Sequence, residues 1–164
     1  FTGEGLEPSG AIKFALTPTS DGRAVAFQQD WIRAWHGTSL EYLESIMHSG
    51  LRVNDKGQIY VTPSFQYAFC LYAVPDLIVG NARFRVVLET RVEPGAYREH
   101  GDCYNFCSPG LIERCIPEDR LEWELKAPAS IQAVGLVLKQ LRPDHPSLMH
   151  DTNVRHACKA LLHF

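Results

Sequence analysis

Residues 35–52 read WHGTSLEYLESIMHSGLR, and they carry the clearest local pattern in the chain. The alternating run WIRAWH leads into this stretch and predicts a strand that ends at His36. Thr38 is expected to cap a following helix, and Glu41 three positions later completes a capping box. Gly50 stands where a helix ends in a left-handed residue. Apolar residues recur at helical spacing between these ends: Leu40, Leu43, Ile46 and Met47.

Further strands are predicted on both sides of this helix. A second short helix is expected over residues 65–73, and another is possible over residues 154–162. The expected elements are mostly strands with a few short helices, and this content predicts an α+β fold with antiparallel sheets. The chain has no Gly-rich phosphate loop and no repeating βαβ pattern, so a dinucleotide-binding fold of the βαβ kind is not predicted. The predicted strands are AIKFAL (11–16), RAVAFQ (23–28), QIYVT (58–62), RFRVVLETRV (83–92), LEWEL (121–125) and VGLVLK (134–139).

The composition is that of an ordinary globular domain. The 164 residues are 45% hydrophobic and 21% charged, and the formal net charge is -3. We expect residues 1–164 to form a single domain excised from a larger protein, with residues 1–10 as a loose lead-in. No run of about 18 apolar residues is present, so no membrane partner is expected. Five cysteines, an odd number, favour an intracellular protein, cytoplasmic or nuclear.

Several side chains stand where chemistry is possible. His36 ends a strand, and Gly37 beside it leaves its backbone open to a ligand because it has no side chain. Tyr67 and Tyr72 on the second helix present aromatic faces that can sandwich a flat heterocycle. Glu122 is a carboxylate at the head of a strand, and such a group near a sugar stabilises a developing oxocarbenium ion. Taken singly, each of these residues is more often structural than functional.

In their order along the chain, these segments resemble the catalytic core of the poly(ADP-ribose) polymerase-like ADP-ribosyltransferases. Those enzymes share a His-Tyr-Glu triad with the diphtheria-type toxins. The resemblance spans roughly residues 31–138 and indicates the triad His36, Tyr60 and Glu122. The motifs that carry it are His36-Gly37-Thr38 with Ile46 and Gly50-Leu51, then Gln58-Ile59-Tyr60 with Tyr67-Ala68, then Glu122-Trp123 with Ile131 and the strand 134–138.

The resemblance implies a role for each matching residue toward NAD. The Gly37 backbone would bind the nicotinamide carboxamide, and Glu122 would hydrogen-bond the 2′-hydroxyl of the nicotinamide ribose. Glu124, two residues on, is the alternative carboxylate. The remaining implied contacts are Tyr60 lining the nicotinamide pocket, Tyr67 or Tyr72 stacking on the ring, His36 and Thr38 holding the adenosine ribose, and Arg52 meeting the adenosine or phosphate end.

The implied fold is two packed, mostly antiparallel sheets around an NAD cleft. The implied reaction cleaves the nicotinamide–ribose bond and transfers ADP-ribose, as a single unit, to a protein or nucleic-acid acceptor. NAD serves as the substrate and no metal is expected. The loop over residues 53–57 is short, and Tyr67 stands where the family usually has a serine. Two alternatives remain: a catalytically inactive module that binds NAD or ADP-ribose, and an RNA 2′-phosphotransferase.

Two further groups of residues are open to a second interpretation. His100, Cys103, Cys107 and Cys115 could form a zinc site, but their spacing matches no common zinc finger. We expect instead that the cysteines are buried or loop thiols of a reduced protein. Arg83, Arg85 and Arg91 share one face of the strand over residues 83–92, and we expect that face to be solvated rather than a nucleic-acid groove.

Overall fold

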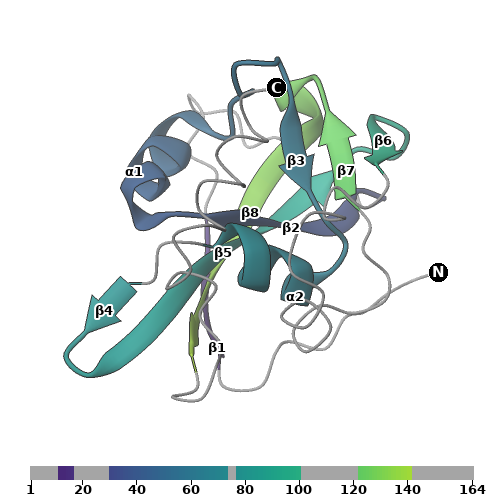
Figure 1. Ribbon diagram of the computed structural model, residues 1–164. Coiled ribbons are helices and arrows are strands. Elements are labelled where there is room, and N and C mark those ends of the chain that lie inside the picture. Colours follow the sequence, from purple (N-terminus) through teal and green to yellow (C-terminus); the bar gives the residue numbers. More distant parts are fainter. Residues whose placement is uncertain (1–10, 17–29, 74–76, 101–121, 142–164) are drawn as a thin grey trace.

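The computed structural model describes residues 11–16, 30–73, 77–100 and 122–141, arranged as Figure 1 shows. Strands predominate in these segments, the helices are short, and every strand pairing is antiparallel. The described part of the chain is therefore α+β, built mainly from antiparallel sheets, as the sequence predicts.

The larger sheet, sheet A, is built around β5 (Ala82–Val92), an inner strand that is buried along most of its length. The strand order is β1–β8–β5–β2, and β4 pairs with the beginning of β5. A bulge between Glu89 and Thr90 shifts the register of β5 against β8. The other strands of sheet A are β1 (Ala11–Ala15), β2 (Ile32–Thr38), β4 (Leu77–Val79) and β8 (Ile131–Gln140).

The smaller sheet, sheet B, has the order β3–β7–β6. Because side chains alternate along a strand, β7 turns Trp123 and Leu125 to one face and Glu122 and Glu124 to the other. The apolar face packs into a core that sheet B shares with sheet A, so the two sheets face each other there. The strands of sheet B are β3 (Ile59–Val61), β6 (Tyr97–His100) and β7 (Glu122–Leu125).

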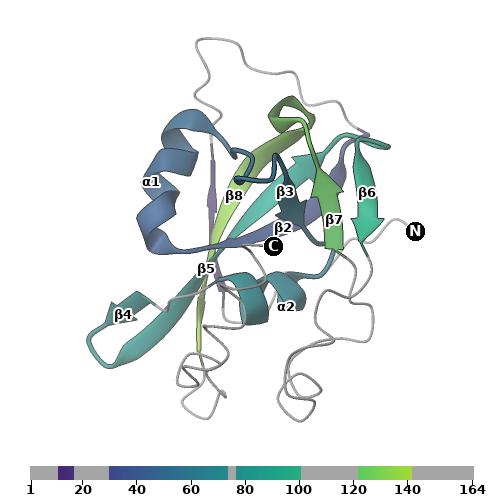
Figure 2. The same ribbon diagram turned by 45° about the horizontal axis from the view of Figure 1, so that its top comes forward.

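Helical segments cover opposite faces of sheet A, as Figure 2 shows for α1 and α2. On one face, α1 (Leu40–Ser49) packs Leu43 and Ile46 against the core that the two sheets share. On the other face, α2 (Phe65–Tyr67) runs directly into a π-helical turn, η1 (Ala68–Tyr72), which packs on Trp35 and on Val87 of β5. A short 3₁₀ turn, η2 (Pro128–Ser130), links β7 to β8.

A buried carboxylate joins three strands of sheet A on the face that carries α2. Glu89 is 3% exposed, and its side chain forms ion pairs with Lys13 of β1 at 2.8 Å and with Arg33 of β2 at 3.1 Å. Arg91 lies 3.7 Å from the same carboxylate. These ion pairs offset the free-energy cost of removing the Glu89 carboxylate from water. Because each of the cations stays partly exposed, no positive charge has to be fully buried for this.

The start of α1 differs from the sequence prediction. Thr38 is the last residue of β2 and is buried, so it does not cap the helix. Ser39 is the N-cap residue instead, and its hydroxyl donates to the Glu41 carboxylate rather than accepting from the helix backbone. The N-cap prediction is therefore wrong by one residue, and the predicted capping box is not formed, because the residue three positions after Ser39 is Tyr42. Gly50 does end the helix with a positive φ of 76°, as expected.

Two strands lie where the sequence analysis assigned none. β4 is only three residues long and pairs with the beginning of β5, and β6 lies between the strands predicted over residues 83–92 and 121–125. The strand expected over residues 23–28 and the helix expected over residues 154–162 lie outside the described residues, as does the lead-in 1–10.

Candidate active site

The candidate site begins where β2 and β3 diverge. Trp35 and Thr62 exchange both backbone hydrogen bonds, at 2.8 and 3.0 Å, and this bridge is isolated. Because backbone groups alternate in direction along a strand, the N–H and C=O of Gly37 point to the same side as those of Trp35, away from β5. In a continued ladder they would meet Tyr60. The bridge between Trp35 and Thr62 is isolated, so no ladder pairs Gly37 with Tyr60, and the N–H and C=O of Gly37 point toward β3 without a ladder partner there.

The side chain of His36 forms a hydrogen bond with Tyr60 in place of the ladder bond that Gly37 and Tyr60 do not form. Its Nδ1 lies 2.8 Å from the carbonyl oxygen of Tyr60. A carbonyl only accepts, so Nδ1 carries the proton and donates, and Nε2 of the neutral ring is left as an acceptor. Burial lowers the pKa of His36 below its ordinary value of 6.5, and the bond to Tyr60 opposes that shift more weakly. His36 is therefore neutral at pH 7.

Gly37 also explains how closely the π-turn approaches β2. A Cβ atom at this position would lie 2.5 Å from the Ala68 carbonyl oxygen, 2.5 Å from Cβ of Tyr72 and 2.7 Å from the Ala73 nitrogen. These distances are too short for any side chain, and two of the three atoms belong to the backbone. Glycine is thus required so that η1 can bring Tyr72 against the strand.

Tyr72 links the π-turn to the second sheet. Its hydroxyl donates a short hydrogen bond to Oε1 of Glu122, a residue 50 positions away in the sequence. Glu122 is 2% exposed and stands at the start of β7. Tyr67 lies behind Tyr72, with ring centroids 5.8 Å apart and planes tilted by 54°. Of the two tyrosines proposed to stack on a ligand ring, Tyr67 is fully buried and Tyr72 is only partly buried.

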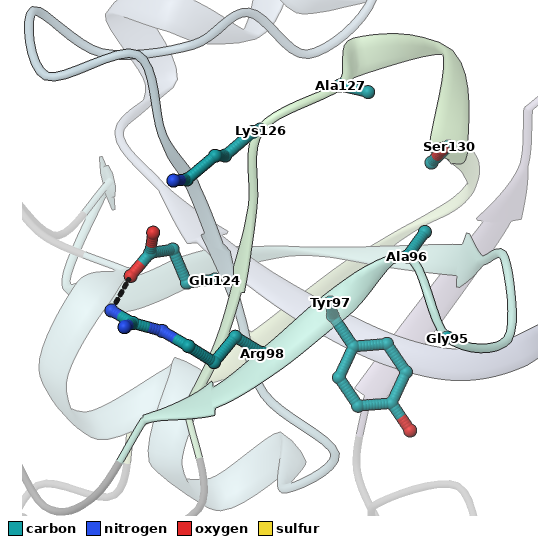
Figure 3. A pocket seen from close by; sticks show the side chains of 8 residues that line it. All are labelled: Gly95, Ala96, Tyr97, Arg98, Glu124, Lys126, Ala127 and Ser130. Atoms are coloured by element: carbon teal, nitrogen blue, oxygen red, sulfur yellow. Dashed lines mark hydrogen bonds and ion pairs between the residues drawn. The ribbon is translucent and has the colours of Figure 1, made fainter.

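The two candidate carboxylates have different partners. Glu124 is paired across sheet B with Tyr60 of β3 and with Arg98 of β6, and its carboxylate meets the Arg98 guanidinium at 2.8 Å. Figure 3 shows this ion pair at the side of an open depression of about 460 Å³ that Lys126 and Ser130 also line. Glu122 is bound instead by a tyrosine hydroxyl from η1. Of the two carboxylates, Glu122 is therefore the one that contacts η1.

Tyr60 and Arg52 complete the set of predicted residues. The Tyr60 hydroxyl donates to Oε1 of Gln58 at 2.7 Å, and its ring lies on the face of sheet B that carries both glutamates. Arg52 is exposed at the start of the loop that precedes β3. In that loop Asn54 accepts backbone N–H groups of Lys56 and Gln58 at 2.9 and 3.0 Å, so the segment closes on itself as a tight turn.

One residue of this region was misread from the sequence. Arg85 is 0% exposed, so the expectation of a solvated arginine face is wrong at this position. Its Nη1 donates to the carbonyls of Phe69 and Cys70 at 2.9 and 3.0 Å. A signal was present, since Arg85 interrupts the apolar half of the most strand-like run in the chain. A charge inside such a run requires a partner.

Among the described residues, no group of three or more His, Cys, Asp or Glu side chains is placed to hold a metal ion. Cys103, Cys107 and Cys115 lie outside those residues, so the zinc interpretation is not tested. No helix in the described segments is long and apolar enough to cross a bilayer.

Comparison with known proteins adds no family: no protein-family model matches the sequence, and no curated protein matches it. What this chain does is therefore argued from its motifs and from the geometry around Gly37.

Proposed function

We propose that this chain is an NAD-dependent ADP-ribosyltransferase. The observation that carries the proposal is the meeting of Gly37, Tyr72 and Glu122, which come from β2, η1 and β7. The first offers an open backbone donor and acceptor, the second an aromatic face, and the third a buried carboxylate. A carboxamide, a pyridinium ring and a ribose hydroxyl are the chemical groups that these three features complement, and the nicotinamide riboside half of NAD carries all three.

The Gly37 N–H and C=O would pair with the carboxamide oxygen and nitrogen of nicotinamide. Tyr72 would stack on the ring, and the stack would fix its orientation because aromatic faces pack offset or tilted. These contacts would hold the glycosidic bond still and position it for cleavage.

Glu122 would supply the electrostatic part of the reaction. When the C1′–N bond breaks, nicotinamide leaves with the bonding electron pair and becomes neutral, and positive charge develops on the ribose. A carboxylate that accepts a hydrogen bond from the 2′-hydroxyl stabilises that charge. An acceptor nucleophile then attacks C1′ and loses its proton, so ADP-ribose becomes attached to it.

The remaining residues would contact the adenosine half of NAD. Nε2 of His36 is the free acceptor of a neutral ring, suited to a ribose hydroxyl, and Thr38 is on the same strand. Tyr60 would line the nicotinamide side, and exposed Arg52 would meet the adenosine or phosphate end. Transfer of a single ADP-ribose to a protein or nucleic-acid acceptor, inside the cell, is the form of the activity that we propose.

A second candidate function is a binding module that holds NAD or ADP-ribose without cleaving it. The short hydrogen bond between Tyr72 and Glu122 favours this alternative, because it occupies the carboxylate oxygen that the reaction would use. Fully buried Tyr67, where the family usually has serine, points the same way.

Calorimetric titration with NAD, with nicotinamide and with ADP-ribose tests the proposal. We expect NAD and nicotinamide to bind, and Tyr72→Ala to weaken both by at least tenfold, whereas Tyr42→Ala on the exposed side of α1 leaves both affinities unchanged. Nicotinamide release measured on the same samples separates the two candidates: the transferase releases it, and the binding module does not. Failure of NAD, nicotinamide and ADP-ribose alike to bind contradicts both candidates, whereas binding of ADP-ribose alone contradicts the transferase and leaves the binding module.

A further inference from the structure

We propose that Arg85 is a positioning residue of this site: it fixes the π-turn that carries Tyr72, and through Tyr72 it sets the orientation of Glu122. The inference rests on the proposed function for its catalytic consequence. The structural part, control of η1 by one buried arginine, stands independently of it.

The contacts of Arg85 are with backbone rather than with an ordinary packing surface. It projects from β5, and its Nη1 donates to the carbonyls of Phe69 and Cys70. The preceding carbonyl, of Ala68, accepts from the Ala73 N–H at 3.0 Å across the π-turn. Successive carbonyls at the end of η1 are thus satisfied by one backbone bond and one guanidinium. The two N–H groups of Nη1 can serve such a pair of acceptors.

Tyr72 follows directly from the residues that Arg85 holds. It lies two positions after Cys70, and its Cβ is one of the atoms pressed against Gly37. Its hydroxyl donates to Glu122. A shift of the π-turn by a fraction of an ångström therefore moves the stacking ring and changes the tyrosine bond to the carboxylate together.

Burial of the Arg85 guanidinium would be electrostatically costly without its contacts with η1. The cross-strand partner of Arg85 is Lys139, another cation. Aromatic rings reduce the repulsion: the Arg85 guanidinium lies 5.5 Å from the centroid of Phe69, and Lys139 Nζ lies 5.4 Å from the same centroid. The α2–η1 segment therefore supplies both the carbonyls and the aromatic faces that allow two adjacent cations beneath it.

A double-mutant cycle tests the catalytic part. Arg85→Met removes the guanidinium at similar volume, and we expect kcat for nicotinamide release to fall at least tenfold with a smaller change in KM. In a Tyr72→Ala background the same substitution should have an effect of less than about twofold, because the residue through which Arg85 acts is gone. Equal losses in both backgrounds would overturn the proposal. Arg85→Lys, which keeps the charge, should restore part of the rate, and it carries the cycle if Arg85→Met does not fold.

Amide hydrogen exchange tests the structural part without any activity. Arg85→Lys should speed exchange of the Ala73 amide about tenfold and leave the Val87 amide of β5 unchanged, because only one or two charge-assisted bonds to the turn are weakened. Arg33→Lys, on the same face of sheet A but paired with Glu89, is the control and should leave Ala73 unaffected. An unchanged Ala73 amide in Arg85→Lys contradicts the inference. A wild type that releases no nicotinamide contradicts the proposed function alone, since the exchange result still decides the role of Arg85.

Discussion

Gly37 and His36 are neighbours on β2, so the His36 side chain and the position that a Cβ of residue 37 would occupy lie on opposite sides of sheet A. Gly37 admits the π-turn on one side, and His36 on the other side takes the Tyr60 carbonyl that a continued β2–β3 ladder would have used. Together they keep the two strands apart at the point where the Gly37 backbone is open. The sequence showed both residues as a motif. It did not show that they act on different partners, because these partners are 24 or more residues away.

Gly37→Ala tests the close approach of η1. We expect a loss of about 1–3 kcal/mol in the free energy of unfolding, because a methyl group would overlap backbone atoms that cannot yield without moving the turn. Chemical denaturation measures it. Gly135→Ala in β8 is the matched control: its Cβ would meet only side-chain atoms of Glu89 and Lys13 at 3.3 Å. Equal losses for the two substitutions would argue against a special role for Gly37.

His36 makes the stability of the domain depend on pH in one direction. Its folded pKa lies below the ordinary value of 6.5, so below pH 6.5 the unfolded chain binds a proton that the folded chain does not. The contribution of neutral His36 to the free energy of unfolding is therefore fully present above pH 6.5. It falls as the pH decreases, by up to about 1.4 kcal/mol per pH unit, until the pKa of the folded state is reached.

His36→Asn removes this titration while its amide can still donate to the Tyr60 carbonyl. We expect the free energy of unfolding of this variant to decline less steeply below pH 6.5 than that of the wild type. His48→Asn, on the exposed side of α1, should decline as the wild type does. Parallel curves for wild type and His36→Asn would show that His36 is not buried in the neutral form.

Among the secondary-structure elements, the α2–η1 segment contributes most to the site. Ser64 starts it, since the Ser64 hydroxyl accepts the Tyr67 N–H at 3.2 Å, and Arg85 holds its end. The helix α1 was the clearest element in the sequence, yet it has no fully buried residue and contributes none of the three central groups. The helix with the strongest local sequence pattern is therefore not the element that contributes most to the site.

Ser64→Ala should lower the free energy of unfolding by about 1 kcal/mol, the usual cost of removing a helix cap. Ser39→Ala is the matched control, because Ser39 caps α1 by position but its hydroxyl makes no bond to the helix backbone. We expect it to cost less than half as much in the same denaturant titration. A larger loss for Ser39→Ala would contradict the assigned caps.

The sequence predicted the elements with strong patterns: β2, α1, β5 and β8. It did not predict β4 or β6, which are short and become strands only by pairing with β5 and β7. Nor could it show that residues 68–72, within the helix expected over residues 65–73, form a π-turn, because the turn depends on Arg85 and on the missing side chain at Gly37. In both cases the deciding interactions are long-range, and local propensity does not report them.

At the scale of the whole molecule, the fold brings together residues that are separated by as many as 85 positions. Gly37 comes from sheet A, Glu122 from sheet B, and Tyr72 from the segment that bridges them. The order of the motifs along the chain singled out these residues as candidates. The structure adds the bond between Tyr72 and Glu122, the ion pair that engages Glu124, and the packing that requires glycine at position 37.

The most direct measurement is nicotinamide release from NAD by the wild type, by Glu122→Gln and by Glu124→Gln. If Glu122 stabilises the developing charge on ribose, we expect Glu122→Gln to lower kcat by about a hundredfold or more. Glu124→Gln, which breaks the ion pair with Arg98, should retain kcat within about threefold, because in the proposed site Glu124 is engaged by Arg98 and does not contact the nicotinamide ribose. Release that survives in Glu122→Gln and is lost in Glu124→Gln would contradict the account, as would a wild type that binds NAD and releases nothing.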